Sequence, residues 1–170
     1  QILSGMFLTM YYVPDVENAW KSVYYLQNEV AFGEIVRGMH HWGASLVIVM
    51  MFLHTLRVFF TGSYKKPREL NWLVGVGIFA VMLGLGFTGY LLPWDMKALF
   101  ATKVGIEIAA SVPFLGEYIK LLLAGDSTIL GAQTLTRFFA IHVFFLPAVL
   151  FALLAVHFIM IRRQGISGPL

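Results

Sequence analysis

Four long apolar runs dominate this 170-residue chain and constrain its fold more than any other feature. They cover residues 1–12, 36–60, 72–92 and 137–161. A helix needs about 20 apolar residues to cross the hydrocarbon layer, where exposed backbone groups find no water to bond. Only 12% of the residues are charged, against about 25% in a typical soluble domain. We therefore predict an all-α fold, a transmembrane four-helix bundle that forms one membrane domain over residues 1–170.

The first apolar run is about half as long as the others, and residue 1 leads directly into it. A charged amino terminus inside lipid is costly. We therefore expect the first helix to be truncated, the second half of a span that begins upstream.

The charged residues between the runs predict the orientation. One end of the predicted bundle carries the basic residues Arg57, Lys65, Lys66, Arg68, Arg162 and Arg163, with Glu69 as the single acid among them. By the positive-inside rule this end lies on the cytoplasmic side, so the formal charge of +3 marks topology and predicts no nucleic-acid partner. The 95–136 connection then lies outside, where amphipathic pieces such as Val104–Ala110 predict short interfacial helices.

Four of the five histidines lie inside the apolar runs, as two pairs with nearly equal spacing. His40 and His54 are 14 residues apart, and His142 and His157 are 15 apart. At about 100° per residue, 14 steps fall about 40° short of whole turns and 15 steps pass them by about 60°. Each pair therefore lies on one face of its helix, its members separated by about 21 Å along the axis. Two such helices predict two stacked sites with one imidazole from either side.

Two opposed neutral imidazoles deep in lipid suit haem iron, which then carries electrons because no coordination position stays open. Zinc requires three or four protein ligands, and no thiol or carboxylate accompanies these histidines within the runs. A single histidine in a span is often a hydrogen-bonded packing residue. Four in matched pairs favour a functional site, because ionisable residues inside spans are rare. His41 points about 100° away from His40 and is interpreted as an interfacial or propionate-side residue, with a simply solvated role as the favoured alternative.

Three glycines and two arginines complete the pattern. Gly75 and Gly89 repeat the 14-residue spacing and, with Gly5, would let a helix approach a flat group closely, although ordinary helix packing also uses glycine. Arg37 and Arg57 each lie one turn from a proposed ligand. A guanidinium there can pair with a haem propionate, and it can also anchor the helix by snorkelling.

Six segments carry a family resemblance: Arg37–His40, His54–Arg57, Gly62–Glu69, Gly89–Asp95, Thr136–His142 and Gly165–Leu170. They resemble the N-terminal half of cytochrome b over nearly the whole chain. The 15-residue spacing and the terminal Gly165–Leu170 segment are similar to the short cytochrome b6 type. The first three runs are most similar to cytochrome b subunits of Firmicutes menaquinol:cytochrome c reductases.

The resemblance implies two haem b groups, one held near the outer face by His40 and His142 and one near the cytoplasmic face by His54 and His157. It implies further site residues around them. Tyr90, Pro93 and Trp94 would border the quinol oxidation site, and Arg162 would lie beside a third haem, of c type, attached upstream of residue 1.

The resemblance also implies the function of a diheme subunit in a quinol:cytochrome c (or plastocyanin) oxidoreductase. Electrons would pass from quinol oxidation outside to quinone reduction on the cytoplasmic side, coupled to proton translocation, with no complete active site in this chain alone. The implied partners are a Rieske-type iron–sulfur subunit, a cytochrome c or f type subunit, a separate subunit IV-like protein, quinol, lipid and a second copy of the complex. The bacterial cell membrane is favoured, with a thylakoid-type membrane as the alternative.

Two other classes of protein stay open at this point. A diheme membrane anchor of a respiratory dehydrogenase would use the same histidines but has no need of the Gly89–Trp94 segment. A non-redox transporter with polar histidines in its bundle would contain no haem.

Overall fold

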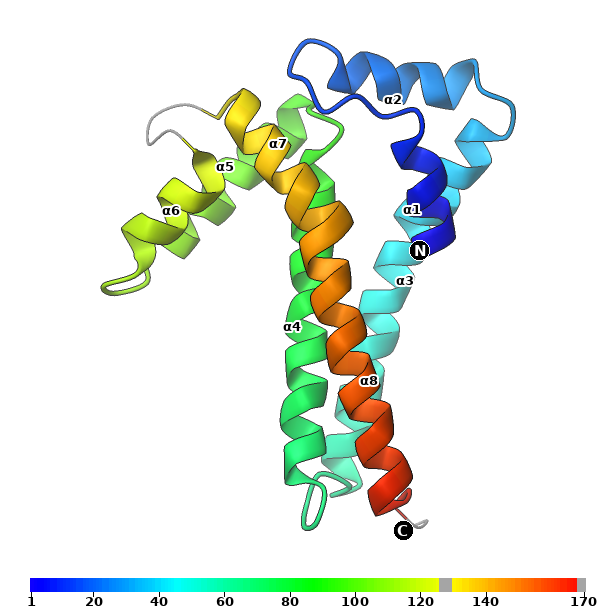
Figure 1. The fold of residues 1–170 in the computed structure, drawn as a ribbon, viewed down its shortest axis with the longest axis vertical. Helices are drawn as coiled ribbons and strands as arrows, with labels where there is room; N and C mark the ends of the chain where they lie inside the picture. Colours follow the sequence, from blue (N-terminus) through cyan, green and yellow to red (C-terminus); the bar gives the residue numbers. More distant parts are fainter. Residues whose placement is uncertain (126–129, 168–170) are drawn as a thin grey trace.

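The computed structural model describes residues 1–125 and 130–167, and these residues form helices joined by short connections, with no strand among them (Figure 1). The elements are α1 Ile2–Thr9, α2 Ala19–Asn28, α3 Gly33–Phe60, α4 Glu69–Leu91, α5 Met96–Ala110, α6 Gly116–Ala124, α7 Ala132–Ala140, the π-helical turn η1 Ile141–Phe145, and α8 Leu146–Gln164. The all-α fold predicted from the apolar runs is confirmed.

Three helical rods are long and apolar enough to cross a membrane within the described ranges. They are α3, α4 and a continuous rod of 33 residues that joins α7, η1 and α8. All three begin before the predicted runs, because polar residues such as Glu34 and Gln133 continue the helix past the apolar layer. Hydropathy therefore locates the lipid crossing better than it locates the helix ends.

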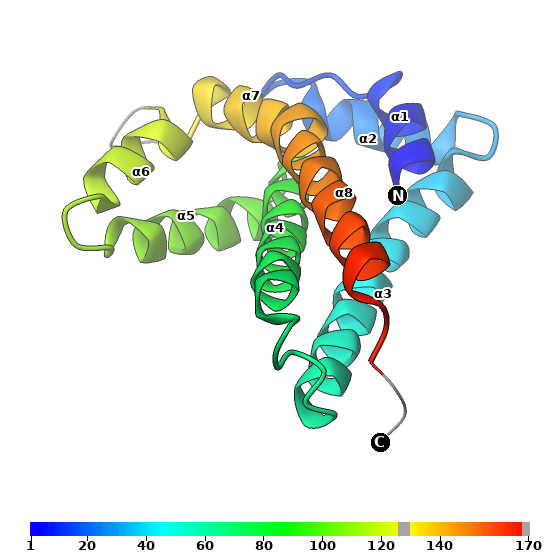
Figure 2. The ribbon, with the colours of Figure 1, turned by 60° about the horizontal axis from the view of Figure 1, so that its bottom comes forward.

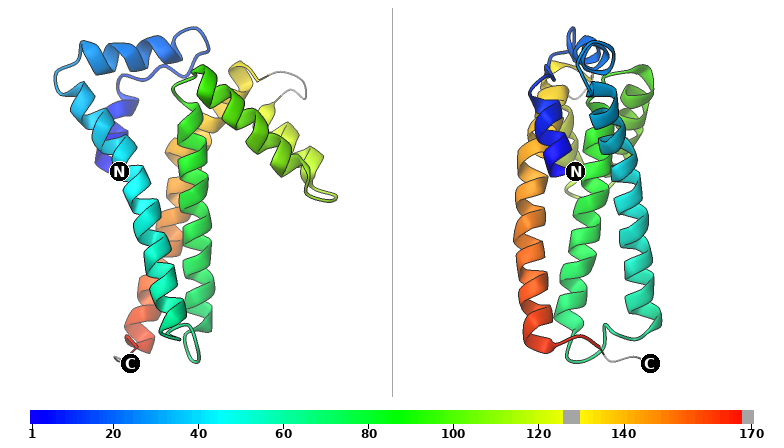
Figure 3. Two further views of the ribbon diagram at one scale, coloured as in Figure 1. Left: turned by 180° about the vertical axis from the view of Figure 1, so that it is seen from behind. Right: turned by 90° about the vertical axis from the view of Figure 1, so that its right-hand side faces the viewer.

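The course of the chain makes two of the rods parallel (Figures 1 and 3). α3 descends from the end that carries α2, α4 returns, and α7 to α8 descends again. α4 packs against both α3 and α8. The α3–α4 connection and the end of α8 therefore lie together at the lower end of Figure 1.

The short helices gather at the upper end. α1 packs against the upper half of α3, and α2 lies across the top of the molecule (Figures 1 and 3). α1 has eight residues. α2 was not predicted, because its turns mix lysine, serine and tyrosine with only a narrow buried stripe of Ala19, Ser22 and Leu26.

α5 and α6 form a hairpin that projects to the side of α4 away from α1 and α3 (Figure 2). The predicted amphipathic piece Val104–Ala110 is the second half of α5. Arg137 of α7 fastens the hairpin, since its Nη1 donates hydrogen bonds to the carbonyls of Leu121 at 2.6 Å and Leu122 at 2.8 Å, near the end of α6. The hairpin is thereby attached to the rod that carries His142 and His157.

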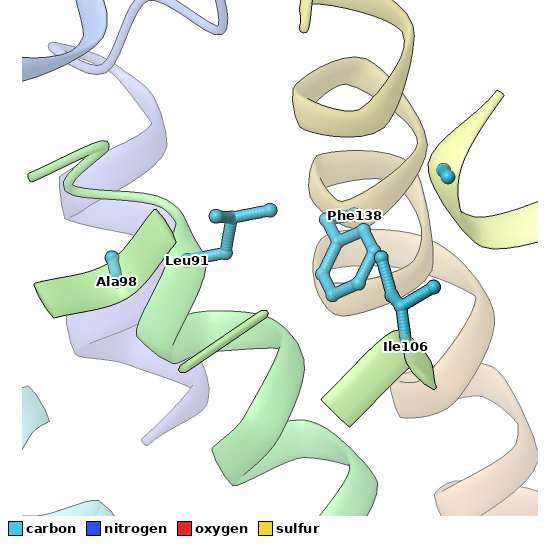
Figure 4. Packing of buried hydrophobic residues seen from close by; sticks show 5 residues of the cluster. Leu91, Ala98, Ile106 and Phe138 are labelled. Carbon is cyan, nitrogen blue, oxygen red and sulfur yellow. The ribbon is translucent and has the colours of Figure 1, made fainter. Parts of the chain in front are cut away.

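A small core at the upper end joins α4, α5, α6 and α7 (Figure 4). Its buried members are Leu91, Ala98, Ile106, Ala124 and Phe138. Elsewhere the long helices bury little: the apolar windows of α3 and of the α7–α8 rod have no buried residue. Most apolar side chains of these two helices are therefore left at least partly uncovered by the described residues.

Replacement of Phe138 with alanine should destabilise the domain. Phe138 is fully buried between α4, α5 and α6, and phenylalanine-to-alanine changes in cores cost about 3–5 kcal/mol. The matched control is Phe100→Ala on the exposed side of α5, where the side chain is 63% exposed. Thermal unfolding of the purified protein in detergent should show a clear drop for Phe138→Ala and little change for Phe100→Ala. Equal midpoints for the two variants would contradict this description of the core.

Candidate functional site

The upper pair of imidazoles lies between the two parallel rods. His40 on α3 and His142 in η1 face each other, with their ring centroids 6.3 Å apart and their planes at 74°. A metal–imidazole bond is about 2.1 Å and the ring centre lies about 1 Å beyond the nitrogen, so two rings on opposite sides of one metal have centroids about 6 Å apart. The observed separation therefore fits one metal ion between the two rings.

Each ring of the upper pair also contacts a hydroxyl group. Nδ1 of His40 lies 3.0 Å from Oγ of Ser4 on α1, and Nδ1 of His142 lies 3.1 Å from Oγ1 of Thr88 on α4. Sequence reasoning missed both hydroxyls, because serine and threonine inside helices commonly bond to their own backbone and give no pattern of their own.

The lower pair, His54 on α3 and His157 on α8, lines a cavity of about 850 Å³. This volume lies within the range of about 300–1,000 Å³ typical of cofactor sites. The cavity walls also include Arg57, Arg68 and Gly75. Nδ1 of His157 is buried and has no hydrogen-bond partner among the described residues.

Three glycines face three of these imidazoles. A Cβ built on Gly5 would lie 3.3 Å from Cε1 of His40, and one on Gly75 would lie 3.4 Å from Cε1 of His157. At Gly89 it would lie only 2.6 Å from Cε1 of His142, closer than real Cβ contacts allow. The absence of side chains here lets α1 and α4 approach the rings, as the glycine spacing predicts.

The turn η1 corrects the unequal spacing of the two histidine pairs. His142 lies inside this π-helical turn, and His157 lies in the regular helix that follows. A π turn bonds residue i to i+5 and so takes up one residue more than an α turn. His142 is the second residue of this turn, so most of the extra residue falls between His142 and His157. It moves their offset from about 60° past whole turns toward the shortfall of about 40° between His40 and His54. The two pairs are therefore closer in angular register than a regular helix would place them.

The predicted arginines lie in three different environments. Arg57 lines the lower cavity, as expected of a residue that pairs with an acidic group there. Nη1 of Arg37 donates a short hydrogen bond to Oε1 of Gln27 on α2. Arg162 is exposed in the last turn of α8 and is not part of the cavity wall.

Of the predicted residues, Tyr90 lies in the last turn of α4, and Pro93 and Trp94 lie in the connection to α5. Trp94 adopts φ 55°, a left-handed conformation that is rare for a large side chain. Its amide donates to the carbonyl of Leu91 at 2.9 Å. The hydroxyl of Tyr12 donates to the carbonyl of Leu92 at 2.7 Å, so the chain after α1 and the end of α4 hold this segment in place.

The donor set indicates what the site can bind. No group of three or more His, Cys, Asp or Glu that could hold a metal ion occurs in the described part of the chain. Two opposed imidazoles beside glycines instead suit a metal that already has four equatorial ligands in a flat ring, which is the arrangement in haem. The ring separation and the cavity volume both fit that group.

The chain after α8 closes the lower end of the cavity. Arg68 donates from Nε to the carbonyl of Gly165 at 3.3 Å and from Nη2 to that of Ile166 at 3.1 Å. Oγ of Ser63 and Oγ of Ser167 lie 2.8 Å apart. Sequence reasoning counted Arg68 only as a topological charge.

Replacement of Arg68 with alanine should release residues 165–167 from the cavity. The loss of two hydrogen bonds from a charged donor, worth about 1.5–3 kcal/mol each, should speed amide hydrogen exchange in these residues by at least about tenfold. Lys65→Ala, in the same connection, is the control and should leave exchange unchanged. Unaltered exchange in the Arg68 variant would show that other contacts hold this segment.

The amino-acid sequence of this chain is similar to those of known proteins. A family described as Cytochrome b/b6/petB matches residues 1–165. The menaquinol:cytochrome c reductase cytochrome b subunit of Bacillus subtilis (strain 168) is 82% identical over all 170 residues, which cover 76% of that protein. The cytochrome b6 of Heliobacterium mobile is 48% identical, again over the whole chain and 79% of that protein.

The fold also matches a solved structure. In a hyperthermophilic respiratory Complex III, one chain superimposes with a TM-score of 0.90 and 35% sequence identity. The match covers 99% of the present chain and 45% of the other, so the present chain spans less than half of that longer protein.

Proposed function

The chain belongs to the cytochrome b/b6 family, and on that premise we propose that it is the cytochrome b subunit of a quinol-oxidising electron-transfer complex of the menaquinol:cytochrome c reductase or b6f type. It is a multi-pass membrane protein and part of an oxidoreductase. The observation that carries the proposal is the 6.3 Å separation of the His40 and His142 rings between parallel rods. Neither a dehydrogenase anchor nor a non-redox transporter accounts for the family match.

We assign one haem b to each imidazole pair, His40 with His142 and His54 with His157. A bound haem would supply a one-electron redox couple, with no open position on the iron. The imidazoles of α3 and of the α7–α8 rod would hold the two groups about 21 Å apart along the helices. Gly5, which faces the His40 ring, leaves room for close packing there.

The residues of this chain set the environment of the two groups. Arg57 in the lower cavity is suited to pair with a propionate, since a guanidinium bonds a carboxylate through two parallel hydrogen bonds. Arg37 already donates to Gln27 and would reach a propionate only by sharing its donors. Arg162 is exposed at the end of α8, where it is free to meet a third haem attached outside the present chain.

Quinol oxidation is assigned to the upper end, beside Tyr90, Pro93 and Trp94. The side chain of Tyr90 is 50% exposed next to the fixed turn at Trp94. Strained backbone at Trp94 supports the assignment, because such conformations cluster at functional sites where surrounding contacts enforce them. The α5–α6 hairpin begins directly after this turn, where the Asp95 side chain accepts a hydrogen bond from the amide of Ala98 at 2.8 Å.

The orientation and the partners follow from charge and exposure. The basic lower end is assigned to the cytoplasmic side, so electrons taken from quinol outside would leave toward a quinone at the cytoplasmic face. The hairpin exposes large apolar side chains, among them Phe114 at 97% and Tyr118 at 74%. This surface supports association with further subunits: an iron–sulfur protein, a cytochrome c or f type protein, a subunit IV-like protein and a second copy of the complex.

Histidine variants test the pairing directly. His40→Ala and His142→Ala should each remove the same single haem, and His54→Ala and His157→Ala should each remove the other. The reason is that both rings of a pair are needed to hold the iron. Reduced-minus-oxidised spectra and pyridine haemochrome assays of the purified complex count the haems. The control His41→Ala should retain both. Loss of both haems from every variant, with the protein still present in the membrane, would contradict the pairing.

Deletion of Phe144 tests the role of η1. Removal of one residue from a π turn leaves an α turn, so His142 and His157 should keep their register and both haems should be retained. The matched control is deletion of Val49 from α3, a helix that runs from Gly33 to Phe60 without a π turn. That deletion rotates His54 by about 100° relative to His40, and one haem should be lost. The same haem content in both variants would show that η1 does not set the register.

A further inference from the structure

We propose that Ser4 and Thr88 are positioning residues that orient the two upper imidazoles and lower the reduction potential of the haem these imidazoles hold. The inference rests on the proposed function, since it concerns residues that act on a haem through its ligands. It assigns a role to two hydroxyl groups that neither the apolar runs nor the histidine spacing accounts for.

The hydrogen bonds of the hydroxyls fix the direction of each contact. Oγ of Ser4 donates to the carbonyl of Gln1 at 3.0 Å, and Oγ1 of Thr88 donates to the carbonyl of Gly84 at 2.8 Å. A hydroxyl has one proton to donate, so each oxygen has only lone pairs left for the imidazole. While the hydroxyls keep these bonds to the backbone, Nδ1 of His40 and Nδ1 of His142 act as the donors.

The direction of these bonds selects one form of each ring. A neutral imidazole that carries its proton on Nδ1 has its lone pair on Nε2. Both upper rings are therefore set to offer Nε2 to a metal while the hydroxyl holds the opposite side of the ring. Hydrogen bonds of this kind orient histidine ligands and raise their basicity.

A hydroxyl residue followed by glycine occurs twice beside the upper imidazoles. This repetition indicates that the two hydroxyl–imidazole contacts are more than a by-product of helical hydroxyls bonded to their own backbone. Ser4 directly precedes Gly5, which faces the His40 ring, and Thr88 directly precedes Gly89, which faces the His142 ring. The two dipeptides lie on different helices, α1 and α4, and each serves a different member of the same pair.

The lower pair provides the contrast. Gly75 faces the His157 ring in the same way, but the residue before it is Val74, which has no hydroxyl. No hydroxyl group of the described residues bonds Nδ1 of His157, which is buried. A more basic ligand stabilises the more highly charged, oxidised iron, so the hydroxyls should lower the potential of the upper haem relative to the lower one.

Potentiometric titration of each haem in the purified complex tests the proposal. Each haem is first assigned by its absence from the matching histidine variant. Thr88→Val, which removes the hydroxyl at nearly constant shape, should raise the midpoint potential of the upper haem and leave that of the lower haem unchanged. Ser4→Ala should have the same effect, and the double variant should raise the midpoint potential of the upper haem further. Thr88→Ser, which keeps a hydroxyl, should leave that potential at its wild-type value.

The controls separate this proposal from the proposed function. Thr136→Val removes a hydroxyl that donates only to the carbonyl of Ala132 and should move neither potential. An unchanged potential of the upper haem with both haems bound, or an equal shift in the potentials of both haems, would overturn the role of the hydroxyls. The proposed function would survive either result. Wild-type protein without two haems would instead overturn the proposed function. If Thr88→Val does not accumulate, Ser4→Ala tests the same expectation.

Discussion

The parallel course of α3 and α8 is the constraint on which the rest of the structure depends. Because both helices descend from the same end, residues at equal depths face each other across the bundle. His40 therefore meets His142, and His54 shares a cavity with His157. α4 runs in the opposite direction, packs against both rods, and presents glycines to the two rings of the α7–α8 rod. Helix direction, histidine spacing and glycine position thus act together to form the two imidazole pairs.

The sequence was sufficient for the parts of the molecule that the membrane dictates. Lipid permits only helices for the long apolar runs, so their number and approximate extent could be predicted. The 14- and 15-residue intervals placed two histidines on one face of each rod, and the structure brings His40 and His142 together. Gly75 and Gly89 were predicted from their 14-residue spacing and Gly5 as a further candidate, and each of the three faces an imidazole.

Other features lay beyond sequence reasoning for physical reasons. The calculation of angular register assumed about 100° per residue, which a π turn does not obey, so η1 could not be foreseen. α2 is held by contacts with its surroundings more than by any apolar stripe of its own. Ser4 and Thr88 act across helix boundaries, and Arg37 has its partner Gln27 on another helix. Such pairs depend on tertiary contacts that no interval along the chain encodes.

The bond between Arg137 and the end of α6 has a mechanical consequence. The rod from α7 to α8 is continuous over 33 residues, with the α5–α6 hairpin fastened near its upper end and His157 near its lower end. A rigid body fastened in this way acts as a lever. Any tilt of the rod would carry the end of α6 with it for as long as these two hydrogen bonds hold.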